Sequence, residues 1–334
     1  MADGWTMNEF RTEYPRFQSP LQIAHSDRML CTGSCFAEHI GGRLRRLKFP
    51  VLVNPFGILY NPVSIAQALE ILQSGAEFQP KDLFEAHGLW HSFAHHGRFS
   101  HPEKEVALAH INHSLLVARE FLSQTTRLIV TLGTANVFVF KKSGDIVANC
   151  HKLPGQEFER RRLSVVETVQ ALVPVFEKLR QQLPSLQIIA TVSPVRHLRD
   201  GLTENQRSKA TLLLALEEIA RCFPFVHYFP AYEILLDDLR DYRFYETDMA
   251  HPNQQAVDYI WEYFAGAFFD EKTRALCQRI ERVVTAAAHR PFHPQFAGHQ
   301  AFLKKQLEET GSLEQEFPGL DFGQEREVFE GKGR

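Results

Sequence analysis

The sequence predicts an α/β protein built on a parallel sheet that helices cover on both faces. Short apolar runs, which are typical of buried strands, alternate with longer segments whose apolar residues recur at helical spacing. The first three apolar runs each lead into a glycine-bearing turn. Strands that alternate with helices are joined by right-handed crossovers and therefore lie parallel. With 334 residues, 44% of them hydrophobic, the chain can bury a substantial core.

The elements follow one another in a regular order from the N-terminal side. The helix after the second strand starts at Pro62, because proline suits the first turn of a helix. A hairpin, formed by residues 137–140 and 146–148, interrupts the alternation after the third strand. The expected strands span 28–33, 49–53, 127–133, 186–192 and 225–229, and the expected helices span 36–48, 62–72, 103–124, 164–182, 204–221 and 257–264.

The chain divides into three parts around this core. Residues 1–20 are polar, contain two prolines and predict an arm on the surface. Residues 21–270 form the α/β domain, and residues 271–334 predict a helical extension with a charged, loose end. The segment 76–102 lacks periodicity and is rich in aromatic residues and histidine, so it predicts an insertion that covers a functional site.

Bulk properties exclude several functional classes. The net charge of −3 gives no reason to expect nucleic acid or an anionic membrane as partner. No apolar run approaches the ~20 residues that span a bilayer, and the N-terminus lacks a secretory pattern, so we expect a cytoplasmic protein. The cysteines are odd in number and form no CxxC pair, which argues against a disulfide framework or a cysteine zinc site. They are Cys31, Cys35, Cys150, Cys222 and Cys277.

The most informative stretch is the turn Gly33-Ser34-Cys35 between the first strand and its helix. Two nucleophile-capable side chains lie where unpaired N–H groups of a helix start can face an anion or a developing oxyanion. The alternative interpretation is a serine N-cap followed by a small buried cysteine.

Polar groups follow the ends of the other strands as well. In an open parallel sheet, ligands bind beyond the carboxyl ends of the strands, so these groups are expected to share one site. In the spacing Asp248-x-x-His251, the carboxylate can orient the imidazole, whose other nitrogen then serves as general base. The groups that we expect at this edge are Ser34, Cys35, Asn54, Gly57, Gly133, Asn136, Arg196, His197, Asp248 and His251.

The sequence also resembles the GSCFA family, which is placed among the SGNH/GDSL-like hydrolases. The resemblance rests on residues 33–37, 54–62, 149–152, 193–197 and 248–252 and covers residues 10–300. It implies a flavodoxin-like three-layer α/β/α sandwich around one five-stranded parallel sheet, with strand order 2-1-3-4-5. It also implies a nucleophile after strand one, a glycine after strand two and an asparagine after strand three.

The same resemblance assigns roles to residues. The N–H of Gly57 and an asparagine amide would complete the oxyanion hole. Ala135 stands where that asparagine is expected, so Asn136 or Asn149 is left to replace it. The ungapped alignment makes Cys35 the nucleophile, and a one-residue gap makes it Ser34. We favour Cys35, because a thiol at a helix N-terminus beside a histidine should have a lowered pKa.

The insertion offers a metal site as an alternative. Two imidazoles four residues apart can share a helical face, yet glycines and aromatic residues interrupt this segment and no acidic residue accompanies the histidines. We therefore expect no bound ion, and expect Trp90, Phe93 and Phe99 to line an apolar pocket at the site entrance. His151 and Arg196 either contact an anionic substrate group or hold a loop.

Together these observations predict an acyl ester hydrolase or acyltransferase without a cofactor. Cys35 or Ser34 would attack the carbonyl, His251 would move the proton and Asp248 would orient it. The substrate would be an acylated small molecule or carbohydrate. The alternative is a non-catalytic carbohydrate- or acyl-binding module on the same scaffold, which the missing asparagine favours.

Overall fold

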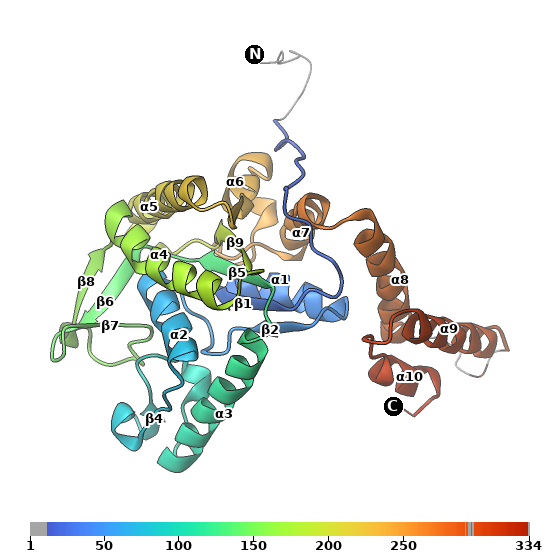
Figure 1. Ribbon diagram of the computed structural model, residues 1–334, viewed down its shortest axis with the longest axis horizontal. Coiled ribbons are helices and arrows are strands. Elements are labelled where there is room, and N and C mark those ends of the chain that lie inside the picture. The colour runs from blue at the N-terminus through green and yellow to red at the C-terminus, as the bar shows by residue number, and fades with distance from the viewer. Residues whose placement is uncertain (1–11, 291, 293–294, 296, 333–334) are drawn as a thin grey trace.

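Figure 1 shows the computed structural model, which describes residues 12–290, 292, 295 and 297–332. At its centre lies a parallel sheet of five strands in the order β2-β1-β5-β9-β10. Numbered along the chain, these strands have the order 2-1-3-4-5, as predicted. The strands are β1 (Met29–Gly33), β2 (Val51–Val53), β5 (Arg127–Leu132), β9 (Gln187–Val192) and β10 (Val226–Phe229).

Helices cover both faces of this sheet, as the alternation of strands and helices predicts. Successive strand residues point to opposite faces. Met29 and Cys31 therefore pack with α1 (Cys35–Arg46) and α7 (Gln254–Phe268), whereas Leu30 packs into the core on the other face. That second layer consists of α2 (Pro62–Ser74), α3 (Lys104–Leu122), α4 (Val165–Gln182) and α5 (Gly201–Cys222).

Two small antiparallel sheets flank the central one. The insertion contains the hairpin β3 (Phe84–Ala86) and β4 (Leu89–His91). The predicted hairpin is present as β6 (Asn136–Phe140) and β7 (Asp145–Val147), and β8 (Phe158–Arg162) joins it by pairing with β6. The sequence did not predict β8, because three consecutive arginines hide its strand pattern. They reach carboxylates of Asp200, Glu167 and Glu204.

The C-terminal extension consists of α8 (Glu271–Ala288), α9 (Ala297–Glu316) and α10 (Gly323–Phe329). Figure 1 shows α8 leading away from the sheet, with α9 and α10 beside it. The prediction of a loose C-terminal end is wrong for residues up to 332. Phe322 and Phe329 are buried, and Lys48 binds the Glu325 carboxylate at 2.8 Å. These two aromatic side chains supply the apolar contact that the charged composition conceals.

The N-terminal arm lies along α7 in its described part. The Tyr263 hydroxyl donates to the carbonyl oxygen of Tyr14 at 2.7 Å, and the Ser19 N–H donates to that of Ala267 at 2.9 Å. Residues 1–11 of the expected arm fall outside the described residues. After β10, the short helix α6 (Ala231–Glu233) continues into a π-helical turn (Ile234–Asp238). Among the described helices, none is long and apolar enough to cross a membrane.

Candidate functional site

The turn after β1 is held by backbone contacts to two neighbouring segments. The Ser34 N–H donates to the carbonyl oxygen of Thr131 in β5 at 3.0 Å. The Gly33 N–H donates to the Asn54 side-chain oxygen, which follows β2, at 2.9 Å. Gly33 has φ +134°, and a Cβ there would lie 2.1 Å from the Thr131 carbonyl oxygen. Only glycine therefore permits this close approach of the two strands.

Ser34 serves as the N-cap of α1. Its Oγ accepts the N–H of Phe36 at 3.3 Å, and the residue is 0% exposed. A hydroxyl that is buried under the turn and engaged with the helix start is poorly placed to reach a substrate. This geometry matches the N-cap interpretation of the serine.

Cys35 is the first residue of α1, and its thiol is half-buried. Burial raises the pKa of this thiol, although its own N–H, the charge of Lys209 and the N–H of Phe36 act in the opposite direction. Burial prevails, so the expectation of a lowered pKa is wrong. The helix start alone does not compensate for the loss of solvent around the thiolate.

The loop after β2 supports the turn but does not present its glycine N–H to the site. The Gly57 N–H donates to the carbonyl oxygen of Asn54 at 2.8 Å, so it is already engaged. The Asn54 amide is buried between the Gly33 N–H and the Glu38 carboxylate, to which it donates at 3.4 Å. In this structure both residues shape the turn, contrary to the expected donor role of Gly57.

The segments after β5 also differ from expectation. The Gly133 N–H donates to the carbonyl oxygen of Tyr60 at 2.8 Å. Asn136 lies in β6 and donates to Asp200 at 3.3 Å, and Asn149 accepts the N–H of His151 at 2.9 Å. The amide of Asn136 is thus engaged with Asp200, whereas Asn149 shapes its own loop through its side-chain oxygen.

His197 offers an unpartnered polar atom instead. Its Nε2 is buried, has no hydrogen-bond partner among the described residues, and lies 3.1 Å from where a Cβ of Gly133 would stand. The Tyr60 ring meets the imidazole edge-on at 5.2 Å between ring centroids. Burial lowers the pKa of His197 to about 3, so the ring is neutral near pH 7.

Asp248 and His251 form the expected pair. The His251 Nδ1 lies 2.6 Å from Asp248 Oδ2, while Oδ1 accepts the N–H groups of Ala250 and His251 at 2.9 and 3.0 Å. These backbone hydrogen bonds, followed by the imidazole contact, lower the pKa of Asp248 to about 2. The carboxylate stays ionised and fixes the imidazole tautomer.

The Asp248–His251 loop lies at the same sheet edge as the Cys35 turn. The Arg196 N–H, just after β9, donates to the Ala250 carbonyl oxygen at 3.0 Å. The guanidinium of Arg196 lies 4.1 Å from the centre of the Tyr245 ring. Burial lowers the pKa of His39, on α1, and that of His197, and the charge of His251 acts in the same direction on both. Arg196 therefore holds this loop, the second of its two interpretations.

The insertion borders the site, as expected. The Arg98 guanidinium reaches the carbonyl oxygen of Asn54 and lies 3.6 Å from the Glu38 carboxylate. The Cβ of His96 lies 2.2 Å from where a Cβ of Gly57 would stand, which explains the glycine. The segment 76–102 is thus tied to the same loops that hold the Cys35 turn.

The prediction that Trp90, Phe93 and Phe99 line an apolar pocket is wrong, because these side chains pack within and beside the insertion. Phe93 stacks on Phe84 at 4.2 Å between centroids, and Phe99 is buried in a small core beside α3. Trp90 lies under the Lys104 ammonium at 4.4 Å. The insertion is large enough to need a core of its own, and these rings supply it.

The histidines of this region are engaged with neighbouring polar groups. His91 Nδ1 lies 2.6 Å from the Ser100 hydroxyl, and His95 Nδ1 lies 3.0 Å from that of Ser92. His151 Nε2 donates to the Ser92 carbonyl oxygen at 2.8 Å and its ring lies 4.4 Å from that of His91. Of its two interpretations, His151 follows the second and holds a loop. No group of three metal-ligating side chains occurs among the described residues.

Sequence reasoning missed Lys209 and Tyr60. Lys209 is 1% exposed, and its Nζ donates to the carbonyl oxygens of Gly133 and Ser193, both at 2.7 Å. The burial of Lys209 could have been predicted from its spacing, because Lys209 precedes Leu212 and Leu216 on the apolar stripe of α5. Tyr60 lies in the block 54–62 that carries the family resemblance, but its contact with His197 depends on the fold.

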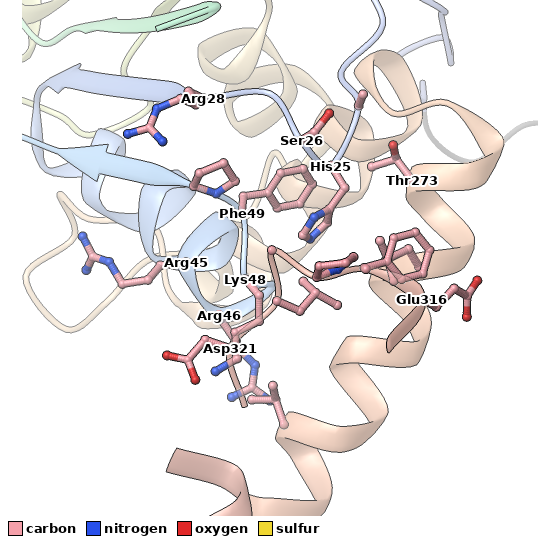
Figure 2. Close-up of a pocket in the computed structure, with 18 of the residues that line it drawn as sticks. His25, Ser26, Arg28, Arg45, Arg46, Lys48, Phe49, Thr273, Glu316 and Asp321 are labelled. Atoms are coloured by element: carbon pink, nitrogen blue, oxygen red, sulfur yellow. The ribbon is translucent and has the colours of Figure 1, made fainter. Parts of the chain in front are cut away.

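A cavity of about 1240 Å³ lies at the other end of α1, away from Cys35. Figure 2 shows His25 and Phe49 side by side in its wall, with Lys48 nearby and Glu316 of α9 opposite. Cys35 begins α1, whereas Arg45 and Arg46, which line the cavity, end it. The cavity therefore lies between the C-terminal helices and the α/β domain and is distinct from the site described above.

The fold and site define an α/β protein with a cysteine-bearing turn at the carboxyl edge of a parallel sheet. The model of the GSCFA family matches residues 28–264, and that of the GSCFA domain protein, C-terminal domain, matches residues 280–332. The first match covers more than half of the chain, so the chain belongs to the GSCFA family. A comparison with curated proteins found no match.

Proposed function

We propose that this protein is an SGNH-like acyl ester hydrolase or acyltransferase with Cys35 as nucleophile. The observation that carries the proposal is the half-buried Cys35 at the start of α1, at the same sheet edge as the hydrogen-bonded Asp248–His251 pair. A nucleophile, a base and a group that orients the base are the three parts of a covalent acyl-transfer site.

In the proposed reaction, Cys35 loses its proton to His251 and its sulfur attacks the acyl carbonyl. The tetrahedral intermediate collapses to a thioester on Cys35, and the leaving alkoxide takes the proton from His251. Water or an acceptor hydroxyl then gives a proton to His251 and attacks the thioester. The acyl product leaves, and the thiolate recovers the proton. Asp248 remains ionised and stabilises the imidazolium between these steps.

Two donors are proposed for the oxyanion. The first is the N–H of Cys35 at the helix start, where backbone N–H groups lack intrahelical partners. The second is Nε2 of His197, which is buried in the structure without substrate and would have to turn toward the bound ester to take over the role of the missing asparagine at Ala135. A neutral imidazole can donate a hydrogen bond at pH 7, and this one has no other partner in the described chain.

A non-catalytic carbohydrate- or acyl-binding module is the second candidate. It is favoured by the Gly57 and Gly133 N–H groups, which are engaged with Asn54 and Tyr60 carbonyls. Steady-state assays with short p-nitrophenyl esters and acyl thioesters separate the two functions. Turnover that depends on Cys35 supports the enzyme, and binding of acylated sugars without any turnover supports the module.

The two histidines are expected to differ in their effects. His251→Ala should slow both ester turnover and the alkylation of Cys35 by iodoacetamide, because it removes the proton acceptor. His197→Ala should lower kcat by about 10²-fold or more, as loss of one oxyanion donor does, and leave alkylation unchanged. Alkylation has no oxyanion, which makes it the discriminating measurement. Equal effects of both variants on alkylation would contradict these roles.

The substrate class and the location are part of the same proposal. An acylated small molecule or carbohydrate fits a site at the edge of the sheet that offers the Cys35 thiol, the Asp248–His251 pair and uncharged hydrogen-bond donors. A cytoplasmic location is supported by the cysteines, all of which are free thiols in the structure. Detection of a disulfide in protein purified under non-reducing conditions without added oxidant would contradict it.

A further inference from the structure

Lys209 is buried directly behind the edge of the sheet that carries the Cys35 turn. Its Nζ donates to the carbonyl oxygens of Gly133 and Ser193, which follow β5 and β9. The Cys35 turn is itself joined to β5 through the hydrogen bond from the Ser34 N–H to Thr131. Gly133 lies only two residues beyond Thr131, so the ammonium and the turn are held by the same strand end.

The hydrogen bonds of Lys209 leave its charge without an anionic partner. An ammonium has three N–H donors, and the two carbonyl oxygens engage two of them. In the part of the chain that the structure describes, no carboxylate lies within ion-pair distance of its Nζ, which lies 5.6 Å from the centre of the Tyr232 ring. A buried cation without a counter-charge is strongly destabilising. An anion that forms nearby would offset this cost.

Cys35 is the group that can supply this anion. Burial lowers the pKa of Lys209 to about 7, and the charge of Cys35 acts in the opposite direction. Burial raises the pKa of Cys35, and the charge of Lys209 opposes that shift. Each group therefore favours the charged form of the other.

The other titratable groups near this pair do not replace Lys209. Glu38, on α1, raises the pKa of Cys35 and so opposes the thiolate. Burial raises the pKa of Tyr60 and lowers that of His197, so both are neutral near pH 7. None of these three groups can therefore supply the positive charge that Lys209 supplies, and the proposed proton acceptor His251 is a separate group whose effect the His251→Ala variant measures.

We infer that Lys209 is a positioning residue whose buried ammonium stabilises the Cys35 thiolate and thereby lowers the pH at which this half-buried thiol becomes reactive. The inference rests on the proposed function for its purpose, since a reactive thiol is what the acyl-transfer site needs. It assigns no contact between Lys209 and the substrate. The lysine acts through Cys35 and through the two strand ends that it joins.

The test is the pH dependence of Cys35 alkylation by iodoacetamide. Alkylation is measured by mass spectrometry of the tryptic peptide 29–43, whose fragment ions distinguish a label on Cys31 from a label on Cys35. Lys209→Met keeps the volume and removes the charge. Its alkylation midpoint should rise by about one pH unit or more, which makes labelling at pH 7 about tenfold slower. Lys178→Met, at an exposed position of α4, is the matched control and should keep the wild-type midpoint.

A reciprocal measurement covers a Lys209→Met chain that fails to fold. In Cys35→Ala the lysine remains, and the ¹⁵N resonance of its Nζ should titrate at lower pH than in wild type, because the thiolate no longer stabilises the ammonium. An unchanged midpoint in folded Lys209→Met, or an unchanged Nζ titration in Cys35→Ala, would overturn the inference. Alkylation needs no turnover, so absence of esterase activity alongside a shifted midpoint refutes the proposed enzyme and leaves the charge pair intact.

Discussion

Replacing Cys35 with alanine should lower kcat/KM for a short p-nitrophenyl ester by about 10⁴-fold or more, because the covalent route is lost. Ser34→Ala should retain most of the activity and lose about 1 kcal/mol of stability, the usual effect of removing a helix N-cap. The measurements are steady-state kinetics and urea unfolding of both variants. Activity that survives in Cys35→Ala but disappears in Ser34→Ala would transfer the nucleophile's role to Ser34.

The control for this comparison is Cys222→Ala. Cys222 is an exposed free thiol at the end of α5, so its removal tests whether any cysteine substitution reduces activity. Wild-type kinetics are expected for it. A similar loss in both cysteine variants would show that the loss in Cys35→Ala is not specific to the site.

Replacing Gly33 with alanine should destabilise the protein by roughly 4 kcal/mol or prevent folding, an exceptional effect for a single methyl group. The added Cβ would lie 2.1 Å from the Thr131 carbonyl oxygen and 2.8 Å from its carbon, and both atoms belong to the β5 backbone. A φ of +134° is also strained for any L side chain. The strand pair that holds the Cys35 turn would have to separate. Urea unfolding, or the soluble yield where no folded protein is obtained, measures the effect.

Gly42→Ala is the matched control, because it adds the same methyl group in open space on α1. Alanine favours a helix over glycine by about 0.5–1 kcal/mol, so this variant should be slightly more stable than wild type. A free energy of unfolding for Gly33→Ala within about 1 kcal/mol of the wild-type value would contradict the close approach of β1 and β5.

The central sheet was predictable because its strands are buried on both faces. Val130 and Ile189 belong to continuous apolar runs, and such runs separated by helical patterns leave few other topologies. Elements stabilised by distant charges were not predictable. Arg160 and Arg162 of β8 pair with carboxylates far along the chain, and Glu325 pairs with Lys48 across 277 positions.

The site was predictable in its location but not in its electrostatics. The turn at Cys35 and the Asp248–His251 pair follow strand ends, so topology alone brings them to one edge. The occupation of the Gly57 N–H by the Asn54 carbonyl depends on the conformation of a single loop. The pKa of Cys35 is raised by burial, which cannot be read from the sequence. The charge of Lys209 opposes this shift, and Lys209 comes from the helix layer on the opposite face of the sheet.

The central claim, that Cys35 is the acylated nucleophile, is tested most directly by trapping the acyl-enzyme. Wild-type protein is mixed with excess p-nitrophenyl acetate, quenched with acid within the first turnovers and digested, and the peptide 29–43 is sequenced by fragmentation. The account predicts one acetyl group on Cys35, present only while substrate lasts. An acetyl group on Ser34, or turnover without any acetylation of this peptide, would contradict it.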